Sequence, residues 1–554
     1  MTKTVLAVGW DSAEPRVLEH YMQTGSLPNL KRLRERGAYG ELQFSGPLNA
    51  ELPWTTFILG SRPAEVGYWD FFNYDPQRYR VSTRAAYEFS ERQPFWALGD
   101  AHKVAVVDVP QGRVVEGVNG VQVLGWGGHS PQGPTISDPP GLMAELVAKH
   151  GESPLLHKDY GQTLRLQDME RIRAQIPTNA RRRTAICRDL MQREAWDLFV
   201  TVYGEPHASG HSAWHVSWPD HPLYDVLRPR VQGDPMREAY AECDRALGEL
   251  VEALPPGSPV VVFSVHGMGA NTKDLPNGLF LPETLFRYSF PQCRAMTGKE
   301  GEPLPAPYTE CLSWSLEVWL SKHDQNPLRK ALLQNMHWGV FSRLERFLGR
   351  GKVCEHGDLV SPYELARETD VVPWMGSHWY RPLWPHMKAF ALPSFSDGCV
   401  RVNVRGRDGQ GVVDPQDYRR VCDEVSELLE GMVDSRRGIK MVSGITRLRD
   451  DPFDPDPTKH AADLFVHWQD DYAADCVEVP GHGRIGPVPH YRAGSHLSKG
   501  FAVICHPDVE PGSTFEGGDV LDLAPTLVSM TGAALSPHFQ GKSLVPNLSP
   551  ARSS

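Results

Sequence analysis

Residues 196–211 read Trp196-Asp197-Leu198-Phe199-Val200-Thr201-Val202-Tyr203-Gly204-Glu205-Pro206-His207-Ala208-Ser209-Gly210-His211. The apolar first part of this stretch predicts a buried strand. His207 and His211 then follow just beyond the carboxyl end of that strand, where open α/β sheets bind their ligands. If the segment forms a helical turn, both imidazoles face the same side and can share one metal ion. The alternative is a surface loop that happens to be rich in histidine, and the rest of the chain must decide between the two.

Length and composition set the class of protein. The 554 residues are 40% hydrophobic and 23% charged, which is typical of a globular chain that is too long for one ordinary core. The formal net charge of −11 argues against a nucleic-acid groove or an anionic membrane surface as the partner. We therefore expect a small-molecule substrate, with no nucleic acid and no membrane involved.

The cysteines and the amino-terminal sequence indicate the cellular compartment in which the protein is expected. Nine cysteines occur singly, with no CxxC pair, which argues against a disulfide framework and for a reducing environment. No stretch approaches the roughly 20 apolar residues that a membrane helix needs. Residues 4–11 are too short and wrongly flanked for a signal peptide and instead predict a first core strand. We expect a cytoplasmic protein.

Apolar strands alternate with helices along the first half of the chain. Residues 5–8 predict a strand that delivers Asp11, and residues 259–263 predict one that delivers His266. Between them, residues 168–193 and 236–254 have the character of helices, the second with Asp234 as its N-cap. This alternation favours a parallel sheet.

The pattern loosens from about residue 280. Aromatic residues and prolines crowd residues 373–386, and residues 390–404 predict a β-hairpin with Asp397-Gly398 at its middle. We therefore predict an α/β fold with a doubly wound, mostly parallel sheet, helices on both faces and an inserted cap subdomain. The expected division is residues 1–280 for the first part of the core, 281–455 for the cap and 456–554 for the return of the core.

Several segments resemble the alkaline phosphatase superfamily, in particular the branch of nucleotide pyrophosphatase/phosphodiesterases and related phosphohydrolase/phosphomutase proteins. They include Asp11, Gly25-Ser26-Leu27-Pro28-Asn29-Leu30, Pro53-Trp54-Thr55-Thr56-Phe57 with Gly60, Gly494-Ser495-His496 with Gly500, and Asp519-Val520-Leu521-Asp522-Leu523-Ala524-Pro525-Thr526-Leu527. The resemblance covers nearly the whole chain, loosely in the cap. It implies a doubly wound sheet, two metal ions, and a Ser or Thr nucleophile at a helix N-terminus that offers N–H groups to a phosphoryl charge.

The resemblance also implies metal ligands, with two departures. The residues that match ligand positions are Asp11, His211, His266 and His496. His207 stands where the family has an Asp, and Val265 stands where it has another acid. With His207, three neutral imidazoles can hold one zinc ion that keeps a position open for water. The other half-site keeps only Asp11 and His266, so a second ion is expected to be weak, absent or completed by Glu51.

The nucleophile is the largest departure. Counting back from Trp54 and Gly60, the usual Ser or Thr position holds Ala50, with Glu51 next to it and Thr55 and Thr56 about one helical turn further on. Glu51 and Thr55 are the candidate catalytic residues. We therefore expect direct attack by a metal-activated water. Glu51 and Asp11 are both candidates for the general base.

These observations predict a zinc-dependent hydrolase of the alkaline phosphatase superfamily that cleaves a phosphodiester or a phosphomonoester. Two alternatives stay open. The altered site can serve a hydrolase or lyase with a non-phosphate substrate, or the protein can be a noncatalytic pseudoenzyme that binds metal or ligand. His215, Asp220 and His221, which follow the histidine pair, are expected to support the ligands or to lie at the surface.

Overall fold

The computed structural model describes residues 3–46, 51–83, 92–128, 133, 135–156, 164–296, 298, 301–311, 314–321, 352–368, 371–456 and 458–545. Ala50, the position at which the family pattern places its nucleophile, lies outside these residues.

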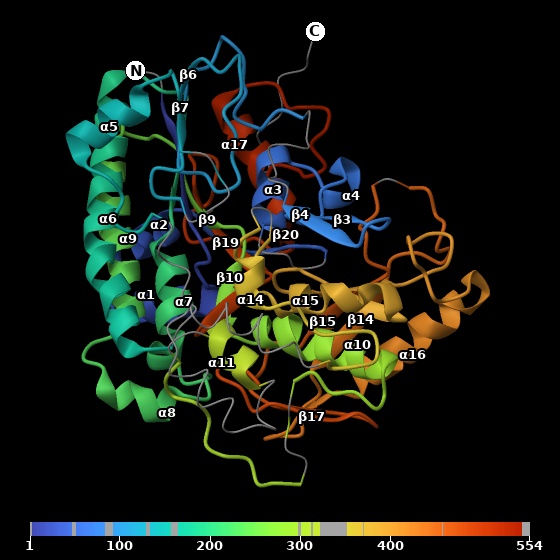
Figure 1. Cartoon of the computed structure of the whole chain (residues 1–554). Helices are drawn as coiled ribbons and strands as arrows, with labels where there is room; N and C mark the ends of the chain where they lie inside the picture. Colours follow the sequence, from blue (N-terminus) through green and yellow to red (C-terminus); the bar gives the residue numbers. More distant parts are fainter. Residues whose placement is uncertain are drawn as a thin grey trace.

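A nine-stranded sheet forms the centre of the molecule (Figure 1). In spatial order its strands are β20 (Gly518–Asp519), β2 (Ala38–Gln43), β19 (Lys499–Cys505), β9 (Val260–Ser264), β1 (Val5–Trp10), β8 (Leu198–Tyr203), β5 (Val104–Val107), β6 (Gly120–Leu124) and β7 (Ile136–Asp138). β1 lies between β9 and β8 and is parallel to both. β19 is antiparallel to β9 and to β2, and β7 is antiparallel to β6. The mostly parallel sheet predicted from the sequence is confirmed.

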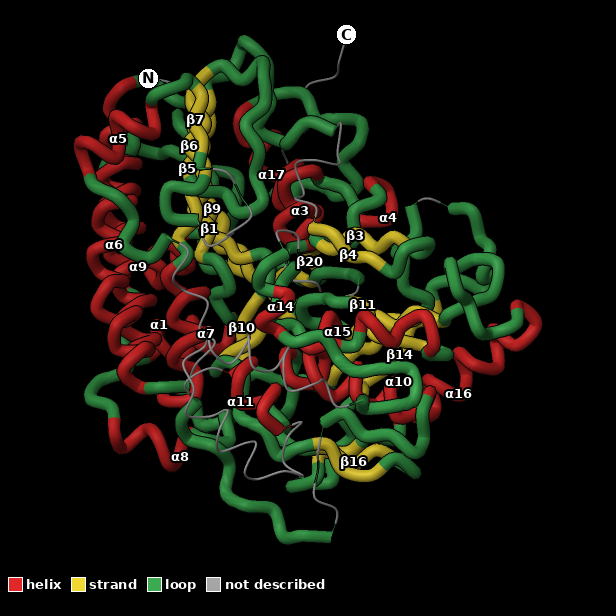
Figure 2. Tube along the Cα trace, in the orientation of Figure 1, coloured by secondary structure: helices red, strands yellow, loops and turns green. Residues whose placement is uncertain are grey.

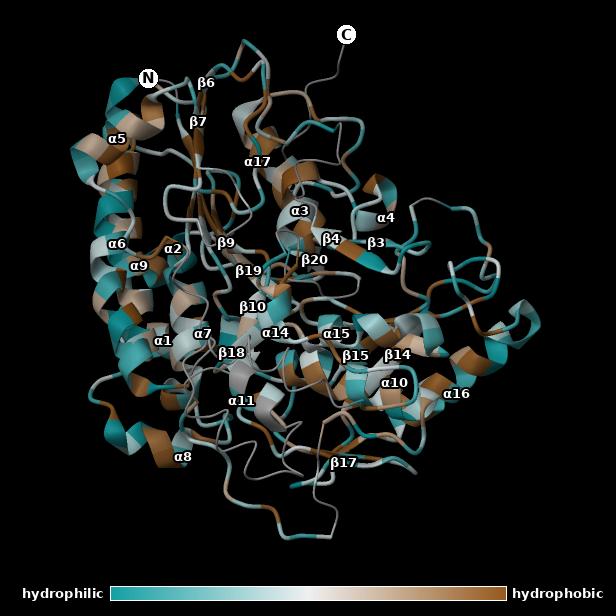
Figure 3. Ribbon diagram, in the orientation of Figure 1, coloured by the Kyte–Doolittle hydropathy of each residue, from teal (hydrophilic) through white to brown (hydrophobic). Residues whose placement is uncertain are grey.

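Helices cover both faces of this sheet. On one face lie α1 (Pro15–Gln23), α2 (Pro28–Arg36), α5 (Leu142–His150), α6 (Leu166–Arg193), α7 (Glu205–Ser217) and α9 (Pro235–Glu252), and on the other lie α3 (Leu52–Leu59) and α17 (Leu523–Thr531) (Figure 1). Alternate residues of β1 serve the two faces: Leu6, Val8 and Trp10 pack in the cluster that includes residues of α9, whereas Val5 and Ala7 pack with α3 and α17. Because both faces are covered, the central strands are largely apolar (Figure 3).

Local signals set the ends of these helices. Asp234 caps α9, since its side chain accepts hydrogen bonds from the N–H groups of Met236 and Arg237. Gly60 ends α3 in the left-handed conformation, with φ of 59°. The cap at Asp234 was expected from the sequence and is confirmed.

A second region lies beside the main sheet (Figure 2). Its four-stranded sheet, called the cap sheet here, has the order β11 (Ala389–Leu392), β12 (Gly398–Val402), β15 (Leu464–Trp468) and β14 (Val442–Arg447). β11 and β12 form the predicted hairpin. β15 pairs with β12 and β14, although its residues fall in the segment expected to return to the core. An apolar strand pattern does not tell which of two sheets the strand joins. The expected division therefore assigned β15 to the core only because it comes late in the chain.

Further helices and strands complete the described part of the chain. They are α4 (Pro63–Val66), β3 (Phe72–Asp75), β4 (Arg80–Thr83), α8 (Tyr224–Leu227), β10 (Gly267–Ala270), α10 (Leu281–Ser289), α11 (Trp314–Ser321), α14 (Pro362–Leu365), α15 (Gly376–Trp379), α16 (Tyr418–Glu430), β13 (Val433–Asp434), β16 (Val477–Val479), β17 (Gly483–Ile485) and β18 (Gly494–Leu497). Short 3-10 turns and a π-helical turn, Pro276–Phe280, complete the chain. All nine cysteines are free thiols, as the sequence pattern predicted. Within the described ranges, no helix has the length and apolar character to cross a membrane.

Candidate metal centre

Three adjacent strands deliver candidate ligands to one edge of the main sheet. Asp11 directly follows β1, His266 lies two residues after β9, and His207 lies in the first turns of α7, which follows β8. Because β9, β1 and β8 are parallel neighbours, their carboxyl ends meet at the same edge. Residues that are far apart in sequence are therefore brought together by the topology of the sheet.

His496 reaches the same place from the other end of the chain. It lies on β18, which pairs antiparallel with β10, and its direct partner there is Met268. The centroid of the His496 ring lies 4.6 Å from that of His266, 4.9 Å from that of His211 and 5.3 Å from that of His207. All four imidazoles are buried.

Two glycines allow helix α7 to lie against β18. A Cβ on Gly210 would meet Met268 Cγ at 2.9 Å, and a Cβ on Gly494 would meet the carbonyl oxygen of Gly210 at 2.5 Å. Side chains at these positions would push the helix away from the strand. The close contact sets the distance between His211, which is next to Gly210, and His496 on β18.

Hydrogen bonds fix the orientation of His211. Its Nδ1–H donates to the carbonyl of Gly494 at 2.7 Å, so Nε2 is the nitrogen that is available as an acceptor or a metal ligand. That Nε2 atom lies 3.1 Å from Nε2 of His207. A backbone carbonyl that holds one ring nitrogen while the other points into a cluster is the usual arrangement of a metal-binding histidine.

His496 is held in its neutral form. Burial, together with the neighbouring His266, His211 and His207, keeps the pKa of His496 well below its usual range. Its Nε2 atom is buried and has no hydrogen-bond partner within the described part of the chain. A neutral imidazole with an unused nitrogen is the form that binds a metal ion.

The donor set fits zinc. The ring nitrogens of His207, His211 and His496 all lie within 4.8 Å of one another. Two imidazole nitrogens on one tetrahedral zinc are separated by about 3.3 Å, given Zn–N distances of about 2.0–2.1 Å, and the 3.1 Å between His207 and His211 is close to this value. Three imidazoles without a carboxylate match the preference of zinc rather than that of calcium or magnesium.

Asp11 and His266 form a pair beside the three histidines. Asp11 Oδ1 lies 3.5 Å from His266 Nε2 and accepts a hydrogen bond from Trp54 Nε1 at 3.0 Å. Nδ1 of His266 lies 3.4 Å from Ser12 Oγ. The carboxylate is fully buried at the end of β1. Val265, which stands where the family has an acid, packs in the apolar cluster between the sheet and α3.

Glu51 and Thr55 lie at the start of α3. The Glu51 carboxylate accepts a hydrogen bond from the hydroxyl of Tyr68 at 2.8 Å. The hydroxyl of Thr55 donates to the backbone carbonyl of Glu51 at 3.1 Å, within the helix. Both side chains are buried. The polar group of Thr55 is thus engaged by its own helix.

Comparison with known proteins gives the family. The type I phosphodiesterase / nucleotide pyrophosphatase family matches residues 5–292, more than half of the chain. The chain belongs to this family. The resemblance drawn from the sequence is confirmed, and membership places the chain among hydrolases of phosphoesters. Curated proteins gave no significant match.

Two solved structures are similar to this member of the phosphodiesterase family. Phosphonoacetate hydrolase from Sinorhizobium meliloti 1021 in complex with phosphonoformate is 15% identical, covers 96% of each chain and gives a TM-score of 0.48. The same enzyme in complex with phosphonoacetate is 14% identical, again with 96% of each chain covered, and gives a TM-score of 0.47.

A buried ion network holds the first turn of α7 in this phosphodiesterase-family chain. Arg183 of α6 contacts both Glu205 oxygens at 2.9 and 3.0 Å and Asp108 Oδ2 at 3.2 Å, and all three residues are buried. Asn179 donates a further hydrogen bond to Glu205 at 2.8 Å. Since Glu205 is two residues before His207, the network fixes where the histidine helix begins.

Two further histidines, His215 and His221, follow His207 and His211 in the sequence and are buried rather than exposed. His215 and His221 are fully enclosed, and their rings lie 5.8 Å apart between centroids. His490 lies 5.2 Å from His221 by the same measure. Asp220 instead forms an ion pair with Arg16 at 2.6 Å, with its side chain partly exposed. The surface position considered from the sequence is therefore wrong for the two histidines.

Sequence reasoning missed one charged residue at the centre. Arg492 Nη1 lies 3.3 Å from Nε2 of His211, and the Arg492 side chain is nearly buried. No spacing rule points to Arg492, because its loop reaches His211 only through the pairing of β10 with β18. Its position four residues before His496 was the only available signal.

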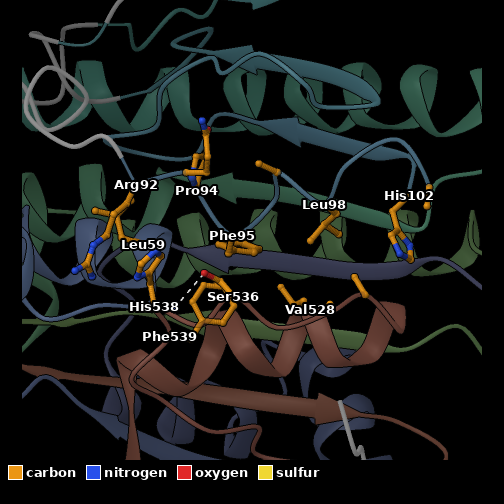
Figure 4. Close-up of a pocket in the computed structure, with 15 residues that line it drawn as sticks. Leu59, Arg92, Pro94, Phe95, Leu98, His102, Val528, Ser536, His538 and Phe539 are labelled. Atoms are coloured by element: carbon orange, nitrogen blue, oxygen red, sulfur yellow. Dashed lines mark hydrogen bonds between the residues drawn. The ribbon is translucent and has the colours of Figure 1, made fainter. Parts of the chain in front are cut away.

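The family member also has a cavity of about 760 Å³ away from these groups (Figure 4). It lies between the segment of Arg92 to His102 and the residues around Val528 and Phe539. Leu59, at the C-terminal end of α3, also lines it. None of the predicted site residues belongs to its lining, so the cavity does not contribute to the metal centre.

Proposed function

We propose that the protein is a zinc-dependent hydrolase that cleaves a phosphodiester or phosphomonoester by attack of water. The observation that carries the proposal is the separation of 3.1 Å between Nε2 of His207 and Nε2 of His211, with Nδ1 of His211 bonded to a carbonyl. His207, His211 and His496 would hold the ion. A bound zinc supplies a Lewis acid and lowers the pKa of a coordinated water.

The remaining residues support an acid–base role for Asp11. Its carboxylate is buried, is bonded to Trp54 and lies next to His266, which in turn contacts His496. We assign to Asp11 the acceptance of the proton from the attacking water. The hydrogen bond from Tyr68 to Glu51 supports a role for Glu51 in holding the start of α3.

Water, rather than a side chain, is the proposed nucleophile because the family position holds Ala50. Single-turnover hydrolysis in 18O-labelled water tests this. Label should enter the phosphate product in the first turnover, and no phosphorylated protein should be trapped. A phosphothreonine at Thr55 or Thr56 would show that the two-step mechanism operates instead.

The function as a whole is tested by metal analysis and turnover together. Purified, zinc-reconstituted protein should bind about one tightly held zinc per chain and hydrolyse an aryl phosphodiester or an aryl phosphomonoester. Zinc without any turnover would favour a noncatalytic role or a substrate without phosphorus. Failure to bind zinc, cobalt or manganese would contradict the proposal.

A further inference from the structure

Arg492 approaches the three histidines from the loop before β18. Its Nη1 atom lies 3.3 Å from Nε2 of His211, the nitrogen that is not bonded to the Gly494 carbonyl. The guanidinium donates five hydrogen bonds in a fixed plane and never accepts one. One of its N–H groups is therefore directed at an atom that also serves as a metal ligand.

The other edge of this guanidinium is fixed. Asp274 accepts a hydrogen bond from Arg492 Nε at 2.6 Å and a longer one from Nη2 at 3.4 Å. Asn271 donates both to Asp274 at 2.8 Å and to the Arg492 carbonyl at 3.0 Å. The Arg492 side chain is only about a tenth exposed. The arginine is thus held in one orientation with its Nη1 end toward the histidines.

Metal binding changes what Arg492 can contact. The single lone pair of His211 Nε2 serves either Arg492 or an ion, but not both. When an ion uses this nitrogen, the Nη1–H group loses His211 as its acceptor and can turn to an acceptor on a bound ligand. A cation this close to a divalent ion also requires negative charge between them. An oxyanion oxygen supplies this negative charge and can accept the Nη1–H hydrogen bond, and guanidinium groups bind phosphate oxygens strongly.

We propose that Arg492, held by Asp274, binds an oxyanion oxygen of the phosphoryl substrate beside the three-histidine centre and couples anion binding to zinc binding. The inference rests on the proposed function and adds to it a residue that recognises the substrate. Because binding couplings are reciprocal, phosphate must strengthen zinc binding to the same extent that zinc strengthens phosphate binding. Arg492 is the source of a large part of this coupling.

The test measures zinc affinity with and without inorganic phosphate, using a chelating dye as competitor. In the unchanged protein, saturating phosphate should tighten zinc binding about tenfold or more. Arg492→Met should bind zinc at least as tightly as the unchanged protein when phosphate is absent, because a nearby positive charge has been removed. Phosphate should then tighten its zinc binding by less than about threefold, and Arg492→Lys should be intermediate.

Arg436→Met is the matched control. Arg436 forms a similar two-point ion pair with Asp475, at 2.6 and 2.7 Å, in the region of β13 and β16. This variant should keep the full phosphate effect. Thermal melts of all variants report whether each is folded, and the Lys variant carries the test if Arg492→Met does not fold.

Two results would overturn the inference. Full phosphate coupling in folded Arg492→Met would remove Arg492 from anion binding. Loss of zinc binding by the Lys and Met variants in the absence of phosphate would show that Arg492 only supports the fold of the site. Phosphate coupling in an unchanged protein that hydrolyses no phosphoester would contradict the proposed function while supporting this role of Arg492.

Discussion

At the scale of single residues, the chemistry of the centre depends on which nitrogen of each imidazole carries a proton. The Gly494 carbonyl fixes this for His211, and burial removes the charged form of His496. The ring of His211 is thus oriented by a backbone carbonyl, and the ring of His496 is neutral. Asp11 contributes a buried carboxylate whose Oδ1 lies 3.5 Å from Nε2 of His266.

His211→Ala should remove both metal and activity. The variant loses one of three imidazole nitrogens, and we expect zinc affinity to fall by more than about 100-fold, beyond the loss usual for residues that only orient a ligand. Equilibrium dialysis followed by elemental analysis measures this. His538→Ala changes an exposed histidine and should leave zinc content unchanged. Retention of tight zinc by His211→Ala would contradict the three-histidine assignment.

Asp11→Asn should lower kcat by about 10²–10⁴-fold, the range of a lost general base. Zinc content should persist, because the three histidines remain. Glu51→Gln should lower kcat less, since the carboxylate already receives a hydrogen bond from Tyr68. Thr55→Ala should act only through positioning. Steady-state kinetics on the zinc-loaded variants compare the three, and a larger effect of Glu51→Gln than of Asp11→Asn would reverse the assignment of the base.

At the scale of elements, helix α7 is placed from both ends. Its first turn is held by the Arg183 network, and its middle lies against β10 and β18 through Gly210. The four-residue spacing of His207 and His211 brings both rings close to His496 only if α7 keeps this position. Changes that leave every ligand intact should therefore still alter the metal centre.

Gly210→Ala should move α7 away from Met268. The added methyl group would begin 2.9 Å from Met268 Cγ, and overpacking of this kind costs about 1–3 kcal/mol of unfolding free energy. We expect zinc affinity to fall together with stability. Gly204→Ala, at the N-cap of the same helix, is the control, since a Cβ there meets no atom within 4 Å and its φ of −89° suits alanine. Equal zinc affinity in both variants would show that the close contact does not position His211.

Arg183→Met should destabilise the protein by about 3–5 kcal/mol, because Glu205 and Asp108 would be left as buried charges without their partner. Arg188→Met is the control on the same helix, where the ion pair with Glu249 is largely exposed and is worth about 0–1 kcal/mol. Urea denaturation measures both. A loss below 1 kcal/mol for Arg183→Met would mean that the network does not hold α7.

At the scale of the whole molecule, buried histidines make the fold sensitive to acid. Burial lowers the pKa of His215, His378 and His460 to about 3 each. The unfolded chain takes up protons on these residues from about pH 6.5 downward, whereas the folded chain does so only near pH 3. Their contribution to stability is therefore complete above pH 6.5 and is lost as the pH falls from 6.5 toward 3.

Denaturant titrations at a series of pH values test this sensitivity. Each of the three histidines adds up to about 1.4 kcal/mol per pH unit to the slope of unfolding free energy. His378→Gln should reduce the slope between pH 6 and pH 4 by up to that amount. An unchanged slope in His378→Gln would show that this residue is protonated in the folded state.

Much of the fold and part of the site could be predicted from the sequence because strand ends are local signals. Apolar runs that end at Asp11, His266 and the His207 segment indicate where a parallel sheet gathers its ligands. The contacts of Gly210 with Met268 and of Arg492 with His211 depend instead on β10 pairing with β18. No local sequence pattern specifies that pairing. The hydrogen bond between Tyr68 and the Glu51 carboxylate likewise cannot be predicted from the sequence.

The position of β19 has a consequence for how the protein is made. This strand enters the main sheet between β2 and β9, although both are synthesised long before it. His496 emerges just ahead of β19, so a chain still growing on the ribosome has an open sheet and only two of the three imidazoles that we propose as ligands. If the three histidines bind zinc as proposed, the complete ligand set forms only after the segment that carries His496 has been synthesised and β18 has paired with β10.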